Sequence, residues 1–190
     1  MAAMILDPLD GWLPGARRVP SPNCDARPAG ADISLIVIHG ISLPPGEYGG
    51  PWIDAMFTNQ LDPAAHHYFA EFCAQRVSAH VLIRRDGELV QYVAFPQRAW
   101  HAGASCFRDQ QACNDFSVGI ELEGSDDDYY TDMQYQVLAR VVAALQCAYP
   151  SILTDHVAGH CDIAPGRKTD PGRGFSWPRF WDLLKNLQTT

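Results

Sequence analysis

The segment from residue 159 to residue 172, GHCDIAPGRKTDPG, combines a histidine with a lysine and two aspartates. Proline–glycine pairs interrupt it twice, so we expect a shaped loop here rather than a helix or a strand. Histidine nitrogens and carboxylate oxygens bind zinc, and catalytic zinc commonly takes three protein ligands with one position left open. His160 and Asp170 are candidate ligands on this loop. His39, which ends an apolar run, is a candidate for the third.

Each candidate ligand also has an ordinary structural explanation. A histidine at a strand end commonly supports the fold, and an aspartate before Pro-Gly commonly forms a turn. His156 lies four residues before His160, which is the spacing of two zinc ligands on one helix face. Gly159 and the β-branched Val157 argue against a helix at this point. His156 therefore ranks below His39 as a ligand.

Glu121 is the candidate general base. It stands between Ile120 and Leu122 in the apolar segment SVGIELEG, so Glu121 and Glu123 should share one face of a strand. On a solvent-facing edge strand both would be ordinary surface acids. In a buried strand, loss of hydration would raise the pKa of Glu121 and make it a useful base. Lys168 has two similar explanations, as a solvated cation or as a group that stabilises an oxyanion.

Apolar patterns indicate the strands that must position these residues. Residues 33–40 (ISLIVIHG) and 115–124 (DFSVGIELEG) are short apolar runs, which predict strands buried on both faces. Residues 76–93 flank Asp86-Gly87, the dipeptide of a tight two-residue turn, and predict a β-hairpin. A strand ending at His39 would hold a ligand rigidly, while the Gly-rich loop that follows shapes the cavity.

Three segments predict helices, of which residues 61–73 are the first. Thr131 and Gln134 form a capping box, and apolar residues follow at helical spacing until Pro150. A last helix begins near Ser176. Strands interleaved with helices predict an α/β (α+β) fold, a central mixed β-sheet flanked by helices.

The length of 190 residues and the 47% hydrophobic content predict one domain with a full-sized core. Residues 1–30 are rich in Pro, Gly and Arg, and we expect an irregular N-terminal arm packed on a domain of residues 31–190. The net charge of −8 argues against nucleic acid as a partner. No obligate protein partner is evident from the sequence.

The apolar runs, the first residues and the cysteines together predict a cytoplasmic protein. No apolar run approaches the roughly 20 residues that cross a membrane, so we expect no membrane anchor. The start, MAAMILDPLD, has no basic region before its few apolar residues and does not resemble a secretory signal. The six cysteines form no CxxC pair, which favours free thiols in a reducing cytoplasm.

Longer motifs give the chain a family resemblance. Five motifs follow one another in the order found in zinc-dependent N-acetylmuramoyl-L-alanine amidases. They are ISLPPGEYGGPWIDAMF, RVSAHVLIRRDGELVQYV, RAWHAG, CNDFSVGIELEG and GHCDIAPGRKTDPG. The chain resembles this family, which includes phage amidase lysozymes and peptidoglycan recognition proteins, over nearly its whole length. The resemblance implies hydrolysis of the amide between the lactyl group of (1,6-anhydro-)N-acetylmuramic acid and L-alanine. The implied setting is cytoplasmic recycling of wall muropeptides, which lowers the muropeptide that induces β-lactamase.

The resemblance also implies residue roles and a Zn²⁺ cofactor. The implied zinc ligands are His39, His160 and Asp170. Glu121 matches the family's catalytic acid/base, and Lys168 matches its transition-state stabiliser. The implied substrate-groove residues are Arg76, Trp100 and Arg167. His80 and His101 are expected as pocket or core neighbours rather than ligands.

One departure and three alternatives remain open. The family pattern leads us to expect Asn after the first ligand, and Gly40 stands there instead, which puts the hydrogen bond of that Asn in doubt. The chain could be a muropeptide receptor without catalysis, or an envelope enzyme acting on intact wall. It could also bind a purely structural zinc, which usually has four protein ligands, with Cys161 as the fourth.

Overall fold

The computed structural model describes residues 4–188. Its centre is a mixed sheet, as the sequence predicts, and the six strands follow the order β1-β5-β4-β9-β3-β10. The strands are β1 (Arg17–Arg18), β3 (Leu35–Ile41), β4 (Val81–Ile83), β5 (Leu89–Gln91), β9 (Ser117–Glu123) and β10 (Val157–Gly159). The pairs β4–β9, β9–β3 and β3–β10 are parallel, whereas β4 and β5 are antiparallel.

The predicted hairpin is confirmed, but its turn differs from the prediction. The Arg84 N–H donates to the carbonyl of Glu88, so three residues, 85–87, form the loop. Gly87 has a φ of +89°, and Asp86 is not among the residues with positive φ. This is the three-residue hairpin loop with one left-handed position, rather than the two-residue turn that needs two.

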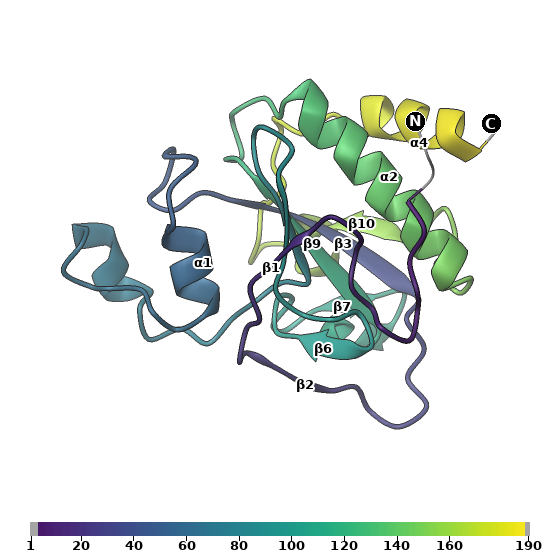
Figure 1. The fold of residues 1–190 in the computed structure, drawn as a ribbon, viewed down its shortest axis with the longest axis horizontal. Helices are drawn as coiled ribbons and strands as arrows, with labels where there is room; N and C mark the ends of the chain where they lie inside the picture. Colours follow the sequence, from purple (N-terminus) through teal and green to yellow (C-terminus); the bar gives the residue numbers. More distant parts are fainter. Residues whose placement is uncertain (1–3, 189–190) are drawn as a thin grey trace.

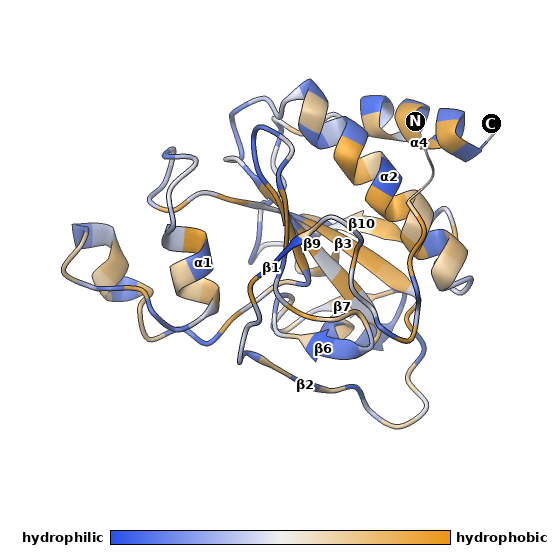
Figure 2. Ribbon diagram, in the orientation of Figure 1, coloured by the Kyte–Doolittle hydropathy of each residue, from blue (hydrophilic) through white to orange (hydrophobic). Residues whose placement is uncertain are grey.

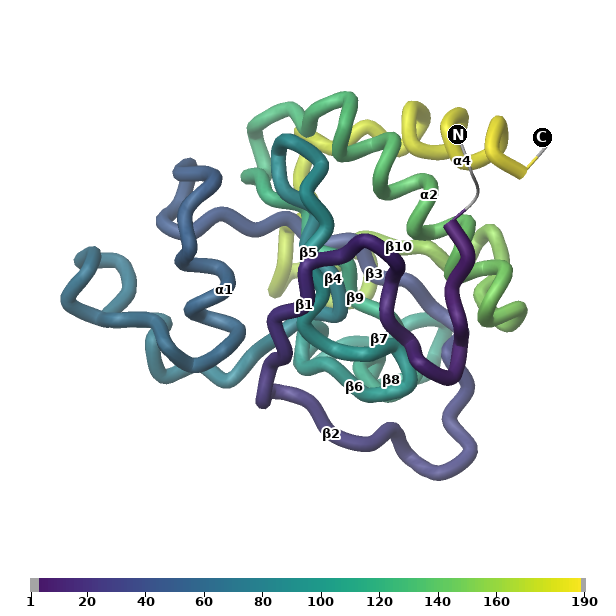
Figure 3. Tube along the Cα trace, in the orientation of Figure 1, coloured from purple at the N-terminus to yellow at the C-terminus, as the bar shows by residue number. Residues whose placement is uncertain are grey.

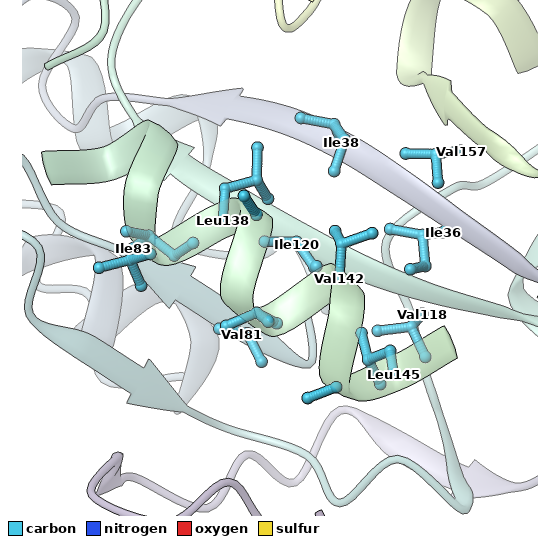
Figure 4. Packing of buried hydrophobic residues seen from close by; sticks show 14 of the residues in the cluster. Ile36, Ile38, Val81, Ile83, Val118, Ile120, Leu138, Val142, Leu145 and Val157 are labelled. Carbon is cyan, nitrogen blue, oxygen red and sulfur yellow. The ribbon is translucent and has the colours of Figure 1, made fainter. Parts of the chain in front are cut away.

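Helix α2 (Asp132–Ala148) covers one face of the sheet. The capping box of Thr131 and Gln134 is confirmed, and each side chain accepts from the other residue's backbone N–H. Figure 4 shows Leu138, Val142 and Leu145 of the helix packed on aliphatic side chains of the strands. Helix α4 (Trp177–Gln188) lies against α2 on its outer side (Figure 1). In Figure 2 the central strands are largely apolar, whereas both helices alternate apolar and polar residues.

Shorter elements cover the opposite face. They are β6 (Gln97–Ala99), β7 (Cys106–Phe107), β8 (Gln110–Gln111), η2 (Cys113–Asp115) and α3 (His160–Ile163). A second set of buried side chains, which includes Leu35, Val37 and Ile163, packs beneath them. Strands β3 and β9 are thus buried on both sides, which explains why their sequences are continuously apolar.

The predicted helix at residues 61–73 is wrong. The segment forms only a five-residue 3-10 helix, η1 (His67–Glu71). The Nδ1 of His66 accepts from the N–H of Tyr68, a local bond that favours a tight turn over a continuing helix. Together with α1 (Trp52–Phe57), η1 extends beyond the sheet in Figure 1.

The N-terminal arm is more regular than predicted. Strand β1 adds to the edge of the sheet in parallel with β5, and β2 (Cys24–Ala26) pairs antiparallel with β6. Figure 3 shows the arm running beside the β4–β5 hairpin. Two or three residues carry too little pattern to indicate such edge strands. The domain boundary at residue 30 stays a prediction.

Across residues 4–188, none of the helices combines the length and the apolar character that crossing a membrane requires.

Candidate active site

The carboxyl ends of three parallel strands bring the candidate residues together. His39 lies near the end of β3, and its partner in the register of β9 is Glu121. His160 follows directly after the last residue of β10. Parallel strands end at the same edge of a sheet, which is where α/β proteins commonly bind ligands. The strand order therefore explains how residues that lie far apart in the sequence meet.

The loop that carries Asp170 departs in one respect from the sequence prediction. Residues 160–163 form helix α3, because the Asp162 carboxylate accepts from the N–H of Gly159 at 2.7 Å and caps the turn. The helix stops at Ile163, since the residue before Pro165 cannot easily stay helical. The chain then turns back, and the Cys161 N–H donates to the carbonyl of Asp170 at 2.9 Å.

Three ligand atoms converge at this edge. His39 Nδ1 lies 3.0 Å from His160 Nδ1, and each nitrogen lies 3.1 Å from Asp170 Oδ2. Three atoms bound tetrahedrally to one ion at zinc distances would lie about 3.3–3.5 Å apart. Two imidazoles and one carboxylate within this spacing form a group that could hold a metal ion, by their chemistry and by their geometry.

The hydrogen bond on the far side of His160 orients its ligand nitrogen. Its Nε2 lies 3.2 Å from the carbonyl of Ala102 and must donate to it, so the lone pair falls on Nδ1. The guanidinium of Arg167 also donates to this carbonyl, at 2.6 Å, and to the carbonyl of Ala104, at 2.7 Å. Arg167 therefore helps to hold the backbone that orients His160.

A chain of hydrogen bonds orients His39 in the same way. The hydroxyl of Ser117 donates to the carbonyl of Cys113 at 2.5 Å, so it must accept from Nε2 of His101 at 3.2 Å. The Nδ1 of His101 then accepts from Nε2 of His39 at 3.0 Å. Burial lowers the pKa of His101 well below its ordinary value, which keeps this ring neutral. The lone pair of His39 is thereby directed at the other two ligand atoms.

The charges of the ligand set suit a cation. Burial lowers the pKa of His39 to about 4, so the imidazole is neutral at pH 7. Burial raises the pKa of Asp170, but the contacts of its carboxylate with the rings of His160 and His39 outweigh burial and hold the pKa below the ordinary value. The site thus presents two neutral nitrogens and one negative oxygen.

Glu121 is the buried acid beside this group. Only 8% of its surface is exposed, and its Oε2 makes no hydrogen bond within residues 4–188. Burial and then the charge of Asp170 raise the pKa of Glu121 well above its ordinary value, and Lys168 opposes them. A carboxylate that is both buried and unpaired is primed to exchange a proton.

Lys168, Arg76 and Trp100 are the remaining residues that the sequence predicted for the site. Lys168 is exposed, and its charge influences the pKa of both His39 and Glu121. The guanidinium of Arg76 is exposed and donates to nearby backbone carbonyls at 3.3 Å. Trp100 is half-buried, and its backbone N–H donates to Ser78 Oγ at 3.2 Å. Binding of substrate by Arg76, Trp100 and Arg167 stays a prediction.

The two alternative ligand candidates, His156 and Cys161, lie outside the ligand group, and so does His80. The ring of His156 contacts the carbonyl of Ser34 and the guanidinium of Arg108. The Sγ of Cys161 lies 3.8 Å from Asp162 Oδ1 and is not among the convergent atoms. His80 is a core residue, with Nδ1 accepting from a backbone N–H and Nε2 facing a backbone carbonyl.

Sequence reasoning missed Ser117 and the function of His101. Ser117, Gly119 and Glu121 alternate along β9 with aliphatic residues, so one face of a buried strand is small or polar. A Cβ on Gly119 would lie 2.5 Å from the ring of His101, so this glycine makes room for the histidine. This alternation of small and polar residues along β9 was the sequence signal that could have predicted a group supporting His39.

A family model described as N-acetylmuramoyl-L-alanine amidase matches residues 29–173. The chain belongs to the N-acetylmuramoyl-L-alanine amidase family, and it is an enzyme of that class.

Particular relatives are similar over nearly the whole chain. The 1,6-anhydro-N-acetylmuramyl-L-alanine amidase AmpD of Escherichia coli is 63% identical over 180 residues, covering 95% of this chain and 97% of the relative. A crystal structure of an AmpD derivative superposes with a TM-score of 0.92 at 61% identity, covering 95% of this chain and 99% of the other. AmpDh3 of Pseudomonas aeruginosa, solved in complex with anhydromuramic pentapeptide, gives a TM-score of 0.59 at 27% identity, with coverage of 84% and 62%.

Proposed function

We propose that this chain is a zinc-dependent amidase that cleaves the amide between the lactyl group of 1,6-anhydro-N-acetylmuramic acid and L-alanine. One observation carries the proposal. His39 Nδ1, His160 Nδ1 and Asp170 Oδ2 converge to 3.0–3.1 Å beside Glu121, a buried acid that lies opposite His39 in the sheet. Ligands next to an unpaired acid suit hydrolysis better than a purely structural site.

The choice of substrate is supported by the relatives. The E. coli relative is named for the 1,6-anhydro substrate, and AmpDh3 binds an anhydromuramic pentapeptide. In a cell, such an activity would act in the recycling of wall fragments in the cytoplasm. In a host with an inducible β-lactamase, it would remove the inducing muropeptide.

The ligand set is suited to Zn²⁺, which prefers nitrogen and carboxylate ligands in a small tetrahedral site. When bound, the ion supplies Lewis-acid chemistry, because it polarises the amide carbonyl and makes water more acidic. Glu121 takes a proton from the attacking water as the C–O bond forms. It then delivers that proton to the alanine nitrogen, because the leaving amine is a very poor leaving group without it.

The cations near the site have separate roles in this proposal. Lys168 stabilises the negative oxygen of the tetrahedral intermediate, as its charge already reaches Glu121. Arg76 and Arg167 supply positive charge for the carboxylates of the peptide stem, which a chain with a net charge of −8 needs locally. Trp100 offers an aromatic face to the sugar.

The test is a product assay on purified anhydromuropeptide and on intact peptidoglycan. We expect release of a peptide with a free L-alanine amino terminus, loss of release with a chelator, and recovery with Zn²⁺. Binding of the muropeptide without any release would instead identify a receptor. Preference for intact peptidoglycan would contradict a recycling role.

A further inference from the structure

Tyr130, just before α2, lies over the ends of two central strands, and only 3% of its surface is exposed. Gly40 in β3 and Gly124 after β9 make room for its ring. A Cβ on Gly40 would lie 2.3 Å from the hydroxyl oxygen of Tyr130, and a Cβ on Gly124 would lie 2.5 Å from its Cε1. Contacts this short do not occur with real side chains, so both positions require glycine for this ring to stay in place.

The hydroxyl of Tyr130 reaches the loop that carries the third ligand. It donates to the carbonyl of Pro171 at 3.0 Å, and Pro171 directly follows Asp170. Pro171 also packs on β3, because its Cα would lie 3.5 Å from a Cβ on Gly40. Successive residues of the loop therefore rest on successive residues of the strand, with Asp170 at His39 and Pro171 at Gly40.

The segment before Tyr130 holds the same loop by its backbone. The Gly174 N–H donates to the carbonyl of Asp126 at 2.8 Å. Gly172 approaches Asp126 so closely that a Cβ would lie 2.2 Å from its Cα. Of these contacts, the hydrogen bond from the Tyr130 hydroxyl involves a side chain and reaches residue 171, directly next to Asp170.

We propose that Tyr130 is a positioning residue that holds Asp170 in the metal site through its hydrogen bond to Pro171. This inference rests on the proposed metal site and gives a role to Gly40, where the family resemblance led us to expect Asn. The space that a side chain at residue 40 would occupy holds the tyrosine hydroxyl instead. The loop is then held from the α2 side of the sheet.

A double-mutant cycle between Tyr130 and Gly40 tests the proposal. The chain is stripped with a chelator, and Zn²⁺ is titrated in competition with a chromogenic chelator. Tyr130→Phe should weaken Zn²⁺ binding about tenfold, the low end of what groups supporting a metal ligand contribute. Gly40→Ala should weaken it at least as much, because its Cβ displaces the hydroxyl.

The double variant gives the decisive comparison. Without the hydroxyl, the nearest ring atom to the new Cβ is Cζ at 3.6 Å, an ordinary contact. Gly40→Ala should therefore change Zn²⁺ affinity less than twofold in the Tyr130→Phe background. If the loss of Zn²⁺ affinity in the double variant equals the product of the losses in the two single variants, the proposal is overturned.

Tyr135→Phe is the matched control. Tyr135 is equally buried, contacts the same Phe175 ring, and accepts from the N–H of Ser176 rather than bonding to residue 171. It should lower the Tm of the metal-free chain and leave Zn²⁺ affinity unchanged. If Tyr130→Phe behaves in the same way, its role is only structural and the inference is wrong.

The titration also separates this inference from the proposed function. If neither the unmodified chain nor Asp170→Ala binds Zn²⁺, the metal site itself is refuted. If the unmodified chain binds Zn²⁺, Asp170→Ala does not, and Tyr130→Phe matches the unmodified chain, only the role of Tyr130 is refuted.

Discussion

Glu121 and Glu123 stand two residues apart on the same face of β9, and both are buried. Their surroundings differ completely. Glu123 accepts from Arg84 at 2.9 Å, from the Gly49 N–H at 2.7 Å and from the Arg85 N–H at 3.2 Å. Glu121 has an oxygen without a partner in the described chain, and the charge that lowers its pKa is that of the exposed Lys168.

The difference shows how one strand supplies both structure and chemistry. A buried carboxylate with three donors is stable as an anion and ties the segments that provide them. A buried carboxylate without donors is costly to ionise, so its pKa is raised and it is able to hold and release a proton. Glu123 should thus matter to folding and Glu121 to turnover, which separate measurements can distinguish.

The largest expected effect is on catalysis by Glu121→Gln. We expect kcat to fall about 10³-fold, because the amide cannot accept the water proton and the usual contribution of such a group is 10²–10⁴-fold. Zn²⁺ content should be unchanged, and Tm unchanged or higher, because an unpaired buried acid is removed. Stopped assays measure kcat, metal analysis measures Zn²⁺ content, and thermal denaturation measures Tm. If kcat of the variant stays within tenfold of normal, Glu121 is not the general base.

Glu123→Gln should show the opposite result. The guanidinium of Arg84 would keep its hydrogen bond to the carbonyl of Gly50 at 3.0 Å, but its remaining carboxylate contacts are longer, 3.4 Å to Glu88 and 3.5 Å to Asp54. Breaking a buried pair in this way costs about 3 kcal/mol of the free energy of unfolding. Urea denaturation measures this loss, and kcat of the folded enzyme should stay within about threefold. A large loss of turnover at normal stability would place Glu123 in the chemistry instead.

Lys168→Ala should reduce kcat about 100-fold, or about 2.7 kcal/mol of barrier, if its charge stabilises the oxyanion. Its exposed side chain should contribute little to stability, in contrast with Arg84. Lys168→Arg is the charge control and should retain part of the activity. Normal turnover by the alanine variant, with zinc still bound, would refute this role.

The smallest effect concerns His80, a buried histidine with both ring nitrogens partnered. Burial lowers the pKa of His80 to about 3, from 6.5 in the unfolded chain. Between these values the unfolded state binds more protons, so this contribution to stability is lost as pH falls from 6.5 towards 3. The slope is at most about 1.4 kcal/mol per pH unit. Denaturation between pH 4.5 and 6.5 should show a shallower slope in His80→Gln, and equal slopes would contradict the assignment.

The strand pattern predicted that Glu121 and Glu123 share a face, but it could not predict their partners. Those partners come from residues 49, 84 and 85, and the pairing of β4 with β9 decides which of them reach Glu123. A sequence pattern gives the face of a strand, whereas partners depend on register between strands. The same limit applies to Tyr130, whose proposed role depends on Gly40 in β3 and on Gly124 just after β9.

Long elements with strong signals were predicted well. The capping box at Thr131 marked the start of α2, and the apolar runs marked β3 and β9. Helix α3 was missed because the breakers Pro165 and Gly166 lie after it, so they end the helix without preventing it. The candidate ligands were predicted from the composition of one loop, from the end of an apolar run and from the family resemblance, and the structure brings them together. Ser117 gave only a weak signal, a small polar residue in an apolar strand.

Arg27, in the N-terminal arm, supports the site from outside the residues that the family model matches. Its guanidinium donates to the carbonyls of Phe95, Asn114, Asp115 and Ser117, at distances of 2.9–3.3 Å. One side chain thus braces the backbone of the serine at the far end of the His39 hydrogen-bond chain. The family match begins at residue 29, so a truncation designed on that boundary would discard this brace and loosen the support behind His39.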